Sequence, residues 1–152
     1  MGQTRNIPYS TIVNEIEGAC DAHLFINSFA HGTLDYLDAS SADKTYPYMF
    51  LRPMSSNIVG AKRTSTFEFY SLDKPGVSTL DNKTIMSNTE QYLYDIISWF
   101  NFGTTARQQV YEFKLTSILP VNEAFQDRLY GWVATLDVVT PWTLDYCIYP
   151  QI

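Results

Sequence analysis

Four side chains in this sequence are soft metal ligands: Cys20, His23, His31 and Cys147. Cys20 and His23 stand at positions i and i+3, so on a helix they would share a face and supply half of a zinc site. The remaining two ligands follow at spacings that match no zinc motif. Because a helical Cys and His more often belong to a core, we predict that the chain binds no metal.

Catalytic motifs are also missing. The sequence contains neither the G-x-S-x-G turn of serine hydrolases nor the glycine-rich loops that bind phosphates. Ser28 and His31 are close in sequence, but that alone sets no geometry. We therefore predict no catalytic residue and no cofactor. A small enzyme of unrecognised type stays an alternative, which His31 and Asp35 converging in a pocket would favour.

The charge balance argues against a nucleic-acid binder. Sixteen acidic residues face ten basic ones, for a net charge of −6, and Lys62-Arg63 is the largest basic cluster. Binding along a phosphate backbone needs a basic stripe. The sequence shows no secretory signal and no apolar run near the roughly 18 residues of a membrane span. The two widely separated cysteines allow one disulfide, but such sparse usage is typical of a reducing cytoplasm.

A dense aromatic stretch, RLYGWVATLDVVTPW, occupies residues 128–142. Trp132, Ala134 and Leu136 alternate with Val133 and Thr135, which is the pattern of a strand with one face in the core. Trp142 follows Pro141, which should end this strand. The stretch therefore predicts a core strand that ends in a partner-facing tryptophan, and not a platform for bases or sugars.

The positions that would hold these side chains fall into one α+β domain spanning residues 1–152. We expect an antiparallel sheet of two β-hairpins packed with two helices. Residues 26–44 are predicted to be an ordered loop with a short strand at 33–37, and residues 74–87 a polar excursion. The expected elements are an N-terminal arm (1–8), helices at 11–23 and 89–101, strands at 46–54, 64–73, 109–119 and 130–140, and a C-terminal tail (141–152).

Cap residues set the expected starts of the two helices. Ser10 or Thr11 would cap the first helix. Asn88 would cap the second, with Gln91 completing a capping box and Gly103 ending the helix.

Several phrases, in this order and spacing, resemble a known family. They are the YP before the first strand, the segment D-x-x-x-G-W (Asp127, Gly131, Trp132) and the closing PWTLDYC. Together they are similar to the neck and tail-completion proteins of tailed bacteriophages, of the tail-terminator type, and most resemble those of Bacteroidetes-type and crAss-like phages. The resemblance covers about residues 9–150.

This resemblance implies a virion protein that is assembled in the host cytoplasm and forms a homo-oligomeric ring of six- or twelve-fold symmetry. It implies a tail-terminator-like sandwich, contacts with portal, neck or tail-tube proteins, and DNA that passes through without specific binding. A ring subunit needs two different patches that meet head to tail. We predict contacts in the 119–130 turn and the tail, at Phe125, Asp127, Arg128, Trp142, Tyr146 and Tyr149.

A stand-alone module that binds a sugar or a peptide is the main rival hypothesis. The surplus of aromatic residues suits it as well as it suits a ring interface. A concave aromatic groove on the single subunit would favour this rival.

Overall fold

Five strands form one mixed sheet in the order β1-β2-β3-β5-β4. The computed structural model describes residues 7–40, 45–74, 82–102, 112–124 and 129–142. β1 runs parallel to β2, and all other neighbouring strands are antiparallel. In chain order the elements are α1 (Tyr9–Ala22), β1 (Ser28–His31), α2 (Leu34–Ser40), β2 (Tyr48–Val59), β3 (Lys62–Asp73), α3 (Asn82–Phe102), β4 (Glu112–Ala124) and β5 (Leu129–Pro141).

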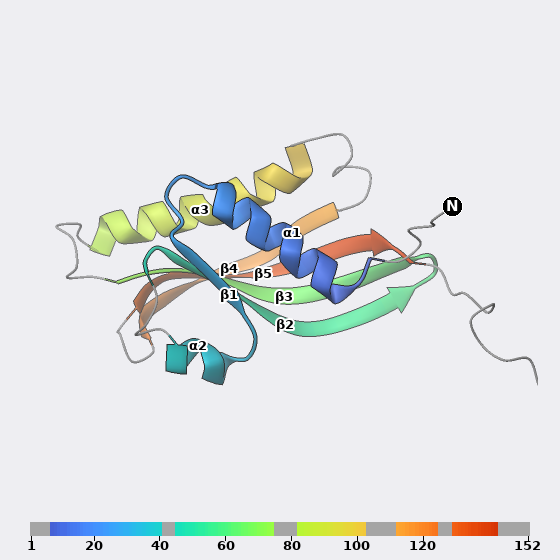
Figure 1. Ribbon diagram of the computed structural model, residues 1–152, viewed down its shortest axis with the longest axis horizontal. Helices are drawn as coiled ribbons and strands as arrows, with labels where there is room; N and C mark the ends of the chain where they lie inside the picture. Colours follow the sequence, from blue (N-terminus) through green and yellow to red (C-terminus); the bar gives the residue numbers. More distant parts are fainter. Residues whose placement is uncertain (1–6, 41–44, 75–81, 103–111, 125–128, 143–152) are drawn as a thin grey trace, which may run out of the picture.

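Helices α1 and α3 lie side by side on one face of the sheet (Figure 1). Their apolar stripes face inward because Ile12 and Ile16, and Leu93, Ile96 and Phe100, recur at helical spacing. The sheet meets them with alternate residues of each strand. These buried strand residues are Met49, Leu51, Phe67, Phe69, Phe113, Ala134, Leu136 and Val138.

The short helix α2 covers part of the opposite face (Figure 1). Leu37 of α2 is fully buried there against those residues of β2, β3 and β5 whose side chains point away from α1 and α3. The buried strand residues of this second cluster are Tyr48, Phe50, Tyr70, Leu72 and Leu129. The sheet is therefore packed on both faces where α2 lies. The rest of the face opposite α1 and α3 is open.

The broad α+β class is confirmed, but the sheet is not built from two hairpins alone. β1 adds a fifth, parallel strand, where the prediction had a loop, and the strand expected at 33–37 is instead part of helix α2. Four residues of β1 are too few to show a periodic pattern. Their position depends on hydrogen bonds to a residue far away in the sequence. Asn27 and Ser28 donate their backbone N–H groups to the carbonyl of Pro47.

The helix starts were also predicted wrongly. α1 begins at Tyr9 after Pro8, without a side-chain cap. Ile7 is buried, so the end of the expected N-terminal arm belongs to the core. Pro suits a helix start because it needs no N–H partner there.

The second predicted helix begins much earlier, at Asn82. Its additional turns bury Ile85, so Asn88 lies inside the helix and does not cap it. Gln91 donates to Asp95, so it forms no capping box. Gly103, the expected end, lies outside the described residues.

Two strands continue beyond the prolines that were expected to mark their ends. β2 continues past Pro53 to Val59, with an irregularity in its pairing between Pro53 and Ser55. A proline is tolerated there because β1 pairs only with residues 48–51, which leaves this part of β2 at the sheet edge. β4 likewise runs through Pro120 on the opposite edge.

Candidate functional site

The turn that joins β2 to β3 lies at one end of the long axis of the molecule (Figure 1). Met54, Ile58 and Val59 are exposed there, Val59 to 77%. Gly60 has a φ of 62°, which allows the tight turn. We call residues 54–63 the β2–β3 tip. Clustered exposed apolar side chains of this kind mark contact surfaces more often than isolated ones do.

Arg63 ties this tip to both ends of the described chain. Its Nε donates to Oγ of Ser56 at 2.9 Å, and its Nη1 donates to the carbonyl oxygen of Ile7 at 2.8 Å. Its guanidinium carbon lies 4.9 Å from the ring centroid of Trp142, a cation–π contact. The backbone N–H of Trp142 donates to the carbonyl of Ala61. Trp142 is therefore attached to the β2–β3 tip of its own chain.

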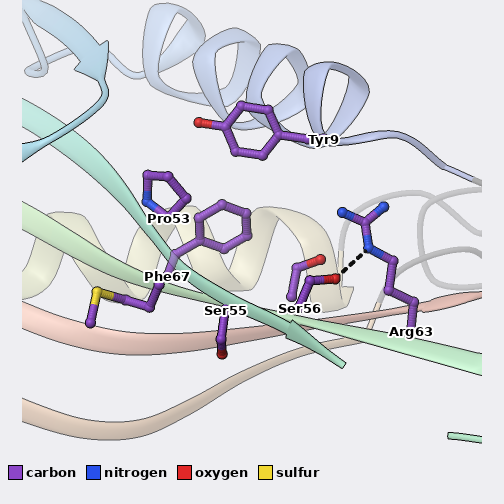
Figure 2. Close-up of a pocket in the computed structure, with 8 residues that line it drawn as sticks. Tyr9, Pro53, Ser55, Ser56, Arg63 and Phe67 are labelled. Atoms are coloured by element: carbon purple, nitrogen blue, oxygen red, sulfur yellow. Dashed lines mark hydrogen bonds between the residues drawn. The ribbon is translucent and has the colours of Figure 1, made fainter. Parts of the chain in front are cut away.

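A hollow of about 200 Å³ lies between the start of α1 and the tip (Figure 2). Tyr9, Pro53 and Phe67 form its apolar wall, and the guanidinium of Arg63 lies at one side. Sites for small molecules usually measure about 300–1,000 Å³. This hollow therefore has the size for one side chain, which is small for the groove that a sugar- or peptide-binding module would need.

Ser65 is the unusual member of this hollow. The residue is only 3% exposed, and its Oγ has no hydrogen-bond partner among the residues that the structure describes. A buried hydroxyl without a partner costs about 1–3 kcal/mol. Native structures retain few such groups, so each one calls for a specific explanation, such as a bound water or ion.

A second exposed patch lies at the C-terminal end of α1, in the other half of the long axis (Figure 1). Leu24 is 89% exposed and Phe25 is 60% exposed. Glu17 and Asp21, one helical turn apart on α1, are also exposed. α1 contains no Lys or Arg. We call these four residues the α1 end; it is apolar and acidic, whereas the β2–β3 tip is apolar and basic.

The loop after α1 is held in place by α3. Nε2 of His23 lies 2.8 Å from Oδ2 of Asp95, and the ring of Phe25 stacks on that of Tyr92. The loop that carries Leu24 and Phe25 is thus fixed to α3.

The open part of the second sheet face carries charged side chains. Glu68 pairs with Arg52 at 2.8 Å, and Glu112 lies 3.8 Å from Lys114. Asp137 accepts a hydrogen bond from the hydroxyl of Thr66. Lys62 lies on the same side of β3 as Glu68, so three carboxylates and three cations alternate on this surface, which we call the open face.

No family model matches this chain, and no curated protein matches it. No helix among the described residues is long and apolar enough to cross a membrane. The geometry and the residues themselves therefore carry the functional argument.

The residues weighed as metal ligands or as an alternative catalytic pair do not share one site in the described part of the chain. Cys20 is a buried free thiol, and burial raises its pKa, with a smaller contribution from Asp21 and Glu17. Nδ1 of His31 lies 3.3 Å from the hydroxyl of Tyr9. Asp35 lines a different hollow beside Arg52, which His31 does not line. Within the described ranges no three His, Cys, Asp or Glu side chains gather into a metal-binding group.

Of the predicted interface residues, only Trp142 lies in the described part of the chain. The others, Phe125, Asp127, Arg128, Tyr146 and Tyr149, lie outside the described residues, as does Cys147. Pro141 is still paired with Lys62 and is the last residue of β5. The strand therefore ends one residue later than the predicted boundary between strand and tail. Sequence reasoning noted Lys62-Arg63 only as a charge and missed the hollow.

Proposed function

We propose that this chain is a structural virion protein that assembles with copies of itself into a ring in the neck or tail of a bacteriophage. The observation that carries the proposal is the pair of exposed apolar patches of opposite charge, the β2–β3 tip and the α1 end. Two unlike patches on separate parts of one subunit are what a head-to-tail contact requires.

The resemblance to tail-terminator and head–tail joining proteins supports the virion setting. On that basis the ring has six or twelve copies, its neighbours are portal, neck or tail-tube proteins, and its sheet with helices α1 and α3 is a version of the tail-terminator sandwich. The subunit performs no catalysis in this role.

The mass of the assembled species tests this proposal. We expect purified protein, alone or mixed with the neighbouring neck or tail proteins, to form a closed species of six or twelve subunit masses. Sedimentation velocity over a concentration series would measure it. A chain that stays monomeric in both conditions would contradict the proposal.

The assembled ring is expected to bind duplex DNA weakly or not at all. If the open face lines the channel, its cations are balanced by Glu68, Glu112 and Asp137, so no basic stripe is available to release counterions. A passing genome then meets no strong binding site. A binding assay at about 50 mM salt checks this, since non-specific electrostatic binding is strong there. Micromolar affinity that weakens steeply with added salt would indicate a DNA-gripping protein instead.

A further inference from the structure

We infer that the hollow beside Arg63 receives a carboxylate side chain from the α1 end of a neighbouring copy. This inference rests on the proposed ring and names its contact. The carboxylate of Glu17 or Asp21 enters the hollow, while Leu24 and Phe25 pack on the exposed apolar residues of the β2–β3 tip.

The hollow has unused hydrogen-bonding capacity for an anion. The buried hydroxyl of Ser65 bonds to no group in the described part of the chain. Ser56 accepts from Arg63 Nε, which leaves the hydroxyl hydrogen of Ser56 free to donate. Arg63 uses Nε and Nη1 within the described part of its own subunit, and its Nη2 makes no hydrogen bond there. These groups are donors, and a carboxylate is an acceptor-only group that can take several of them at once.

The size of the hollow favours a side chain over a free ligand. Its volume of about 200 Å³ lies below the usual range for small-molecule sites. Tyr9 and Phe67 line its wall, so the methylene stem of an acidic side chain would contact apolar surface. The hollow therefore fits Asp or Glu with its carboxylate directed toward Arg63.

The α1 end carries both the acidic and the apolar side chains that complement the β2–β3 tip. Glu17 and Asp21 lie on one face of a helix that carries no basic residue, so their charge is not neutralised within it. Leu24 and Phe25 lie directly beyond them in the chain. On the tip, Ile58 stands opposite Arg63 in the strand register, next to the hollow. In one orientation the acidic residues of the α1 end face the basic residues of the tip, and the apolar residues of the two patches face each other. This match fixes how the two copies are aligned.

Complementary charge reversals test the contact. Lys62→Glu together with Arg63→Glu makes the tip acidic, and Glu17→Lys with Asp21→Lys makes the α1 end basic. We expect each variant alone to lose self-association by about a hundredfold or more, because like charges then face each other. Mixing the two variants should restore assembly, since each reversed patch meets a reversed partner. Glu112→Lys, on the open face, is the matched charge control and should assemble like the wild type.

Ser65→Ala gives a second readout that a merely structural role would not produce. We expect this variant to melt about 3 °C higher than the wild type, because an unsatisfied buried hydroxyl is removed. It should nevertheless assemble about ten-fold to a hundred-fold more weakly, because a hydrogen bond to a charged group is lost. Ser71→Ala is the matched control: Ser71 is also buried and unpartnered on β3 but does not line the hollow. It should raise the melting temperature and leave assembly unchanged.

The outcomes separate the two proposals. If the wild type assembles and each reversed variant also assembles alone, or if Ser65→Ala assembles normally, the contact is wrong while the ring stands. If the wild type stays monomeric at about 1 mM and with its neighbouring proteins, where even weak contacts are populated, both are overturned.

Discussion

Replacing Gly131 with alanine is expected to lower the free energy of unfolding by about 3 kcal/mol or more. Gly131 lies on β5 with a φ of +157°. An ideal Cβ at this position would lie 1.9 Å from the carbonyl oxygen of Ser71 and 3.1 Å from Cα of Leu72. These are backbone atoms of the neighbouring central strand β3, so the two strands would have to separate to admit a methyl group.

Gly18→Ala is the matched control for this prediction. Gly18 lies on the exposed side of α1, with no heavy atom within 4 Å of its ideal Cβ. Alanine should stabilise the helix there by about 0.5–1 kcal/mol. Urea unfolding of both variants measures the difference. Equal effects of the two substitutions would contradict the close approach of β3 and β5.

Phe113→Ala is expected to cost about 3–5 kcal/mol of stability, the usual loss when a buried aromatic side chain is removed. The rings of Phe113 on β4 and Phe100 on α3 are stacked, with centroids 4.1 Å apart. The side chain of Asn101 also bonds the backbone N–H and C=O of Phe113. This residue therefore fixes the C-terminal half of α3 on the edge of the sheet.

The neighbouring Glu112→Ala is the control, because Glu112 is exposed and should change stability by less than about 0.5 kcal/mol. A double-mutant cycle of Phe100→Ala with Phe113→Ala should show a coupling of about 0.5–1.5 kcal/mol. Thermal or urea unfolding provides both values. A loss below about 1 kcal/mol for Phe113→Ala would show that the two rings do not pack as described.

The parts of the fold with a regular pattern were predictable from the sequence. Phe67 and Phe69 alternate on β3, and Ala134, Leu136 and Val138 alternate on β5; all five are buried in one cluster, as expected. Trp132 packs against the same cluster, and its indole N–H donates to the carbonyl of Met86. Successive side chains of a strand point to opposite faces of the sheet, so a strand with one buried face has apolar residues at every second position. This is why the pattern in the sequence predicted the buried face correctly.

Elements set by distant contacts could not be predicted. β1 is held by hydrogen bonds to the segment before β2, and α2 by the packing of Leu34 and Leu37 against the second cluster. Asn88 has the right residue type for a helix cap. The burial of Ile85 extends the helix past it, because apolar burial outweighs a cap of about 1 kcal/mol.

The candidate site was predicted even less completely, for the same reason. Ser55–Gly60 has the composition of a loop, so the sequence indicated a turn and not an exposed strand end. The hollow brings together Tyr9, Pro53 and Arg63, which are far apart in the chain. Only the aromatic surplus and the isolated Lys62-Arg63 pair pointed toward this end of the molecule.

Under the proposal the gene for this chain belongs to a phage, and electron cryomicroscopy of that phage's virions tests the central proposal most directly. We predict a closed ring of six or twelve copies at the neck or at the end of the tail, with the β2–β3 tip of each subunit on the α1 end of the next. Virions that lack the chain, or that hold it anywhere other than in such a ring, would contradict the proposal.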